Sequence, residues 1–191
     1  MSRMKICIGL LRGVNVGGKK MIPMARLKSW LEEQQFGEVR TLLQSGNAVF
    51  RSPKPVNSQL EQALEKAAER DLSLQADFHL RTPSEWAALI AGNPFAREAR
   101  DDPSHLVALL LKAAPTAVQA AALQQAIPGR ERAVVAGRQA YLYYPDGIGD
   151  SRLTPALLDR TLGTRGTARN WNTVLKLAAA AAELAASDLS Q

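Results

Sequence analysis

The chain has 191 residues, 46% of them hydrophobic and 22% charged, as in a globular protein of one large domain or two small ones. A single cysteine, Cys7, excludes an internal disulfide and a cysteine-based zinc site. The first apolar run is too short for a signal-peptide core, and none approaches the ~20 residues that span a bilayer. We therefore expect a cytoplasmic protein with no membrane segment.

Positive charge is concentrated in two parts of the chain. Residues 1–54 contain ten Lys or Arg and three acidic residues. Residues 55–191 contain fourteen Lys or Arg and fifteen acidic residues. Five basic residues and no acid lie between Arg12 and Lys28, and residues 160–182 form a second acid-free stretch. Such clusters favour an anionic partner, namely nucleic acid, a nucleotide or another phosphate. The alternative is a solvated surface with a chance excess of charge.

Apolar spacing, capping residues and turn residues predict the elements of the first half. Pro23 suits the first position of a helix, and Ser58 with Glu61 and Thr82 with Glu85 form capping boxes. In chain order the expected elements are a strand at 3–11, a helix at 23–35, strands at 39–43 and 48–51, a helix from Ser58, a strand at 74–81 and a short helix from Thr82.

The second half repeats much of this order. Thr154 and Pro155 are suited to begin a helix, and Gly163 is suited to end it. The expected elements are a strand at 105–111, a helix at 115–126, a hairpin of 131–136 with 139–144, the helix that Thr154 caps, and a last helix from about Asn172 to Ala186.

This order predicts an α+β fold of two ferredoxin-like (βαββαβ-type) halves with antiparallel sheets, followed by a C-terminal helix. We place the first half at residues 1–92 and a related βαββαα half at residues 104–191, with residues 93–103 as the junction. One compact domain is the alternative.

A glycine-rich basic loop follows the first strand. In a ferredoxin-like sheet the third strand returns between the first two, so this loop should lie beside the turn at 44–47. Glycines and a helix N-terminus expose backbone N–H groups to an anion, and basic side chains add full charges. Structural turns are the alternative. The candidate ligand-binding residues here are Arg12, Asn15, Gly17, Gly18, Lys19 and Lys20, with Ser45 and Asn47 in the turn.

The same loop fits the phosphate-binding P-loop pattern until its last position. Lys20 stands where that pattern needs a hydroxyl for magnesium, and the expected sheet is antiparallel. We therefore expect an anion site without nucleotide hydrolysis, and no metal or cofactor. Asp146 and Asp150 lack the repeated oxygen ligands of a calcium loop. His79 and His105 have no metal-ligand spacing and are treated as non-catalytic.

A second candidate segment precedes the last helix. Asn172 is the first choice for its N-cap and Asn170 the second. Trp171 either packs in the core or offers a face for a base to stack on. Arg169, close to free helix N–H groups, would suit a phosphate. Arg169, Asn170, Trp171 and Asn172 therefore complete the candidate ligand-binding residues.

Four segments together resemble a known family. They are residues 11–19 (LRGVNVGGK), 44–47 (QSGN), 143–147 (YYPDG) and 169–174 (RNWNTV). In this order they are similar to the bacterial domain-of-unknown-function family 1697. The resemblance implies a soluble bacterial α/β protein with ferredoxin-like halves, and it implies no established activity, substrate or catalytic residue.

These features support three hypotheses. The first is a module that binds nucleic acid or a phosphorylated ligand. The second is an enzyme acting on a small anionic substrate, with Asn15, Asn47 and Asn172 positioning it and Lys19 or Lys20 stabilising charge, although no general base is evident. The third is a structural or partner-binding protein, which an exposed apolar patch would favour.

Overall fold

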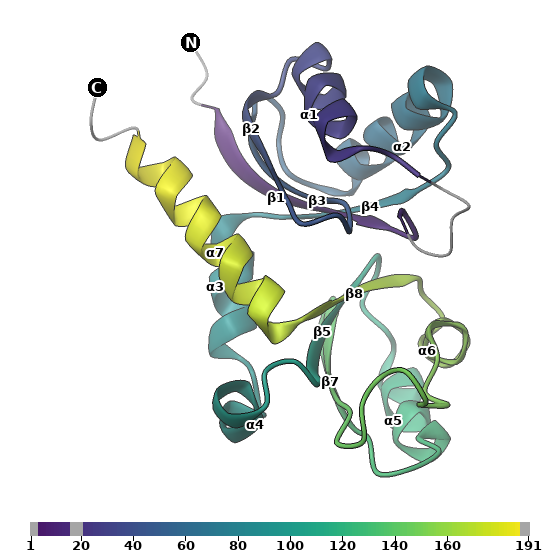
Figure 1. The fold of residues 1–191 in the computed structure, drawn as a ribbon. Helices are drawn as coiled ribbons and strands as arrows, with labels where there is room; N and C mark the ends of the chain where they lie inside the picture. The colour runs from purple at the N-terminus through teal and green to yellow at the C-terminus, as the bar shows by residue number, and fades with distance from the viewer. Residues whose placement is uncertain (1–3, 16–20, 188–191) are drawn as a thin grey trace. The chain divides into compact units, whose positions relative to one another are not determined.

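The computed structural model describes residues 4–15 and 21–187 (Figure 1). The chain divides into two compact units. Unit 1 comprises the residues up to Ala88 together with those from Lys176 onward, and unit 2 comprises Leu89–Leu175. The unit boundaries fall inside two helices, α3 (Pro83–Ala91) and α7 (Trp171–Ala186).

Unit 1 contains a four-stranded antiparallel sheet in the order β2-β3-β1-β4. Helices α1 and α2 cover one face of this sheet (Figure 1). A helix after the first strand and another after the third give the ferredoxin-like arrangement. The elements are β1 (Lys5–Arg12), α1 (Met24–Glu33), β2 (Gly37–Leu42), β3 (Asn47–Ser52), α2 (Ser58–Leu72) and β4 (Asp77–Arg81).

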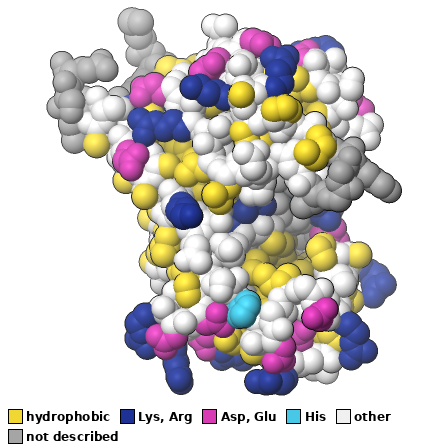
Figure 2. Space-filling model, viewed as in Figure 1, with side chains coloured by type: hydrophobic (Ala, Val, Ile, Leu, Met, Phe, Trp, Pro, Cys, Tyr) yellow, Lys and Arg dark blue, Asp and Glu magenta, His cyan; other side chains and the backbone are white. Residues whose placement is uncertain are grey.

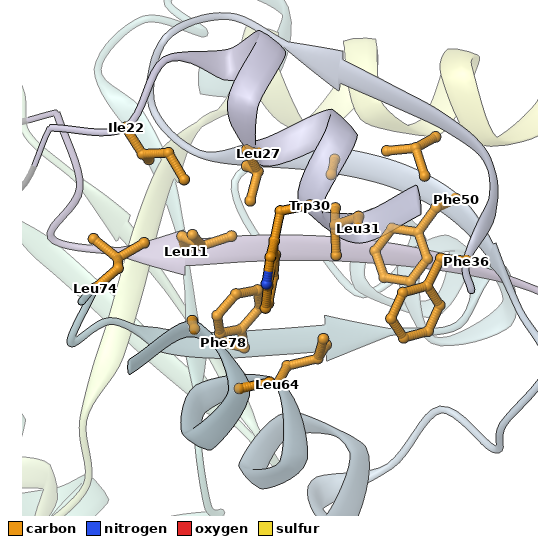
Figure 3. Close-up of a cluster of buried hydrophobic side chains, with 14 of the residues drawn as sticks. Leu11, Ile22, Leu27, Trp30, Leu31, Phe36, Phe50, Leu64, Leu74 and Phe78 are labelled. Atoms are coloured by element: carbon orange, nitrogen blue, oxygen red, sulfur yellow. The ribbon is translucent and has the colours of Figure 1, made fainter. Parts of the chain in front are cut away.

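The core of unit 1 lies between this sheet and its two helices. Trp30 of α1 is fully buried, and its ring centroid lies 6.0 Å from that of Phe78 on β4. The indole N–H donates to a carboxylate oxygen of Asp71 at 3.2 Å, which meets the polar requirement of a buried tryptophan. Figure 3 shows side chains from β1, α1, β3, α2 and β4 converging around these rings.

Unit 2 repeats the same topology, with a four-stranded antiparallel sheet in the order β6-β7-β5-β8. Helices α5 and α6 cover one face of this sheet (Figure 1). The expected α+β fold with two ferredoxin-like halves and a C-terminal helix is confirmed. The elements of unit 2 are α4 (Ala96–Asp101), β5 (Leu106–Leu111), α5 (Ala117–Ala126), β6 (Arg132–Ala136), β7 (Gln139–Tyr143), α6 (Pro155–Leu162) and β8 (Gly166–Asn170).

Strand β8 corrects the βαββαα order that was expected for residues 104–191. Its sequence, GTARN, has one β-branched residue and no apolar alternation, so local propensity does not reveal a strand. The ladder with β5 supplies the missing information, since Leu111 pairs with Gly166 and Val107 with Asn170. The second half is therefore βαββαβ followed by α7.

Helix caps are predicted well at two helices and wrongly at a third. Thr82 and Glu85 bond each other's backbone N–H groups, and Thr154 begins α6, which ends at the left-handed Gly163. At α2 the N-cap is Asn57 and not Ser58, because the Asn57 side chain accepts from the Leu60 N–H at 3.0 Å.

The C-terminal end of α7 is held within unit 1. The Arg51 guanidinium donates to the backbone carbonyl of Leu184 at 2.7 Å, which satisfies an acceptor that the helix end leaves open. Across residues 4–15 and 21–187, no helix combines the length and apolar character needed to cross a membrane.

Candidate functional site

The predicted contact between the first loop and the turn at 44–47 is confirmed for the described residues. Leu10, near the end of β1, pairs with Asn47 at the start of β3. The Leu11 N–H donates to the Gly46 carbonyl at 2.8 Å. We call residues 12–15, 22 and 43–47 the loop–hairpin edge of unit 1.

Asn15 joins three segments of the loop–hairpin edge. Its amide nitrogen donates to the carbonyl of Gln44 at 2.7 Å and to that of Ile22 at 2.9 Å. Its amide oxygen accepts from the Ile22 N–H at 2.8 Å. Both N–H donors of the amide are therefore used within the protein. Asn15 holds the two ends of the segment 16–21 together against the hairpin.

Left-handed backbone is concentrated at the same edge. Gly13, Asn15, Leu43 and Gly46 all have φ between 58° and 72°. A Cβ atom on Gly46 would lie 2.5 Å from a methyl carbon of Val14, so glycine is required there for both conformation and space. For Asn15 and Leu43 the conformation is unfavourable and is maintained by the surrounding contacts.

The two candidate residues of the hairpin bond each other. Asn47 is fully buried, and its side chain donates to the Leu42 carbonyl at 3.0 Å and to the Ser45 hydroxyl at 2.9 Å. These bonds stabilise the turn between β2 and β3. Arg12 is half-buried at the end of β1, where its register partner on β4 is Asp77. Gly17, Gly18, Lys19 and Lys20 lie outside the described residues.

The remaining candidates, residues 169–172, lie in unit 2. The Arg169 guanidinium is buried and donates to the Thr167 hydroxyl at 2.9 Å and the Ala168 carbonyl at 2.8 Å. Burial lowers the pKa of Arg169 to about 10. Trp171 is also buried, with its ring centroid 6.5 Å from that of Tyr141, so it takes the core position of the two alternatives.

Asn170, and not Asn172, caps α7. The Asn170 side-chain oxygen accepts from the Thr173 N–H at 3.0 Å and from the Thr173 hydroxyl at 2.9 Å. Asn172 is exposed in the first turn. The first choice of cap made from the sequence is therefore wrong, and the second is correct.

Unit 2 also holds a cluster of three polar side chains that the sequence did not indicate. One carboxylate oxygen of Asp102, Oδ2, lies 2.9 Å from Nδ1 of His105 and accepts from the Tyr143 hydroxyl at 3.0 Å. The hydrogen bond from His105 lowers the pKa of Asp102, and the hydrogen bond to Asp102 raises the pKa of Tyr143. We call these three residues the Asp102 cluster.

The β5–β7 ladder assembles the Asp102 cluster. Leu106 pairs with Tyr143, and the Tyr144 N–H donates to the His105 carbonyl at 3.0 Å, which brings together residues 41 apart in sequence. The local signal in the sequence is the three-residue spacing of Asp102 and His105, and this spacing by itself does not indicate a hydrogen-bonded pair. Tyr143 begins the segment 143–147, one of the four segments that resemble the family.

An open cavity of about 380 Å³ adjoins the Asp102 cluster. Asp102 and Tyr143 line it together with Arg97, Arg130 and Arg132. The guanidinium of Arg132 lies 5.0 Å from the ring centroids of both Phe95 and Tyr143, and it also bonds Glu98. Cation–π contact on both sides holds this guanidinium in place. Within the described residues, no three His, Cys, Asp or Glu side chains gather to hold a metal ion.

Comparison with known proteins supports the family and the fold. The family model described as "Protein of unknown function (DUF1697)" matches residues 4–141. A solved structure, that of the conserved bacterial protein SP0830 from Streptococcus pneumoniae, is similar with a TM-score of 0.71 and 21% identity, covering 93% of this chain and 99% of that one. None of the curated proteins matches the chain. The protein thus belongs to the DUF1697 family of proteins of unknown function.

Proposed function

We propose that the protein binds a phosphate-bearing anion at the loop–hairpin edge of unit 1. In the sequence, the residues between Asn15 and Ile22 include Lys19 and Lys20, and no acid occurs between Arg12 and Lys28. The charge of this part of the chain therefore favours an anion over a cation or a neutral ligand.

The bonds between Asn15 and Ile22 are the observation that carries the proposal. Two hydrogen bonds of 2.8 and 2.9 Å join Asn15 to Ile22, the residues on either side of the cationic segment. The Asn15 amide also donates to the carbonyl of Gln44 in the hairpin. Hydrogen bonds that hold the residues flanking a binding segment in place reduce the conformational entropy that is lost on binding, and this favours affinity.

The proposal assigns different roles to the candidate residues. Asn15 and Asn47 use their amides within the protein, so they position the edge and do not contact the ligand. Arg12, Lys19 and Lys20 supply the charge that attracts the anion. Residues 169–172 lie in unit 2, and the proposal does not use them.

Binding of two probes to the full chain tests the proposal at low salt. The probes are pyrophosphate, followed by calorimetry, and a fluorescein-labelled single-stranded oligonucleotide, followed by anisotropy. The variant Lys19→Ala/Lys20→Ala is compared with Lys54→Ala/Lys66→Ala, which removes the same charge from exposed positions of unit 1. We expect the first variant to lose about tenfold or more in affinity and the second to bind like wild type.

The two probes separate the possible sources of phosphate. A nucleic-acid ligand predicts tight oligonucleotide binding with a strong salt dependence, whose log–log slope becomes shallower by about 1.4 when two lysines are removed. A small phosphorylated ligand predicts pyrophosphate binding that the oligonucleotide does not surpass. Equal binding by the two double variants, or no binding of either probe, would contradict the proposal.

A further inference from the structure

We propose that the Asp102 cluster of unit 2 is a proton-transfer site, in which His105 acts as general base toward a small substrate that carries a carboxylate or phosphate. This site is separate from the anion site proposed for unit 1. Figure 2 shows a histidine side chain at the surface, with acidic side chains beside it.

The hydrogen-bond geometry determines which ring nitrogen is available. An ionised carboxylate can only accept, so at 2.9 Å from Asp102 the Nδ1 atom of His105 carries the proton. In neutral imidazole the other nitrogen, Nε2, then has a free lone pair. Asp102 thus orients the ring and offsets the positive charge that forms when Nε2 accepts a proton, which makes it a positioning residue.

The surroundings leave Nε2 open to a ligand. The His105 side chain is 40% exposed. Gly147 approaches from the segment that follows β7, and a Cβ atom there would lie 3.9 Å from Nε2. Gly147 has φ +91°, which favours glycine, so this position keeps a side chain away from the ring nitrogen.

The adjoining cavity indicates the charge of the substrate. Arg97, Arg130 and Arg132 line it together with the carboxylates of Glu98, Asp101 and Asp102, and each arginine forms an ion pair with a carboxylate. His105 does not line the cavity itself and adjoins it through Asp102. A guanidinium has five N–H donors, of which one carboxylate uses at most two, so donors remain for a second anion. Arg97 and Arg130 are the most exposed of the three arginines, with side chains 84% and 75% exposed, and Arg130 pairs with Asp146.

The probe reaction is hydrolysis of mono-4-nitrophenyl succinate, an ester that carries a carboxylate. Water loses a proton to Nε2 of His105 while its oxygen bonds to the acyl carbon. The bond to the 4-nitrophenyl oxygen then breaks, and that oxygen takes the proton from Nε2. Succinate and 4-nitrophenol are the products, and solvent water is the co-reactant. Neutral 4-nitrophenyl acetate serves as the comparison ester.

We expect wild type to hydrolyse the succinate ester about 100-fold faster than His105→Gln, within the range of general-base catalysis. Arg130→Gln should remove the preference for the charged ester over the neutral one. Asp150→Ala, which changes an exposed carboxylate of unit 2, is the matched control for Asp102→Ala and should keep the wild-type rate. Equal rates for wild type and His105→Gln would overturn the proposal.

A second measurement does not depend on turnover. Long-range ¹H–¹⁵N spectra of the full chain report which ring nitrogen of His105 is protonated. We expect the Nδ1–H form in wild type and in Tyr143→Phe, and a shift toward the Nε2–H form in Asp102→Ala. An Nε2–H ring in wild type, or no change in Asp102→Ala, contradicts the positioning role of Asp102.

Discussion

The side-chain amide of Asn15 donates a hydrogen bond of 2.7 Å to the backbone carbonyl of Gln44, 29 residues further along the chain. The same amide bonds both backbone groups of Ile22. One side chain therefore connects three segments: the loop after β1, Ile22 just before α1, and the β2–β3 turn. The stability of this edge should depend on Asn15 more than on its charged neighbours.

Replacement of Asn15 separates its hydrogen bonds from its backbone conformation. Asn15→Gly removes the bonds but tolerates φ 58°, and it should lower the free energy of unfolding by about 1–3 kcal/mol. Asn15→Ala adds left-handed strain of about 1 kcal/mol. Urea denaturation of both variants measures the difference. An Asn15→Ala variant as stable as Asn15→Gly contradicts the assigned strain.

Gly46 and Gly13 form a matched pair at the same edge. Both have positive φ, but a Cβ on Gly13 meets nothing within 4 Å, whereas one on Gly46 meets Val14 and Leu11 at 2.5 and 2.9 Å. Gly13→Ala should cost about 1 kcal/mol from backbone strain alone. Gly46→Ala should cost about 1–3 kcal/mol more because of the overlap. Thermal or urea unfolding in which the two costs are equal would rule out close packing at Gly46.

The correct N-cap of α7 can be tested by two alanine substitutions. Asn170→Ala removes the acceptor of the Thr173 N–H and should destabilise the protein by about 1 kcal/mol. Asn172→Ala changes an exposed first-turn residue and should be neutral or slightly stabilising, since alanine favours helix by about 0.5 kcal/mol. The denaturation midpoints of the two variants measure this difference. A larger loss of stability in Asn172→Ala than in Asn170→Ala would identify Asn172 as the cap.

The Asp102 cluster should make stability depend on pH. The pKa of Asp102 is lowered in the folded state, chiefly by the His105 hydrogen bond. As pH falls toward the ordinary aspartate pKa of about 3.9, the unfolded state therefore binds more protons than the folded state. This contribution is present above that value and is lost as pH falls through the folded-state pKa. Wild type should therefore exceed Asp102→Asn in stability at neutral pH, and the difference should shrink in acid. Urea unfolding across this range checks it, and a constant difference would contradict it.

Local signals in the sequence were sufficient for most elements. Thr154, Pro155 and Gly163 determine α6 because a cap, a fixed φ and a left-handed terminus act within one helix. The contact between the first loop and the β2–β3 turn could also be predicted, because the ferredoxin-like order leaves few ways to place the third strand. In both cases the information lies within the chain segment or its topology.

Tertiary structure alone decided β8, the roles of Asn15 and Asn47, and the Asp102 cluster. The GTARN segment becomes a strand because β5 offers it an edge, which no local propensity encodes. Asn15 and Asn47 suit a ligand by composition, but their amides meet backbone carbonyls that the fold brings to them. Asp102 and Tyr143 share a hydrogen bond only because β5 and β7 pair in one register. The sequence by itself determined the elements, their order and the distribution of charge, whereas the partners of each polar side chain depend on contacts between distant segments, which exist only after the chain has folded.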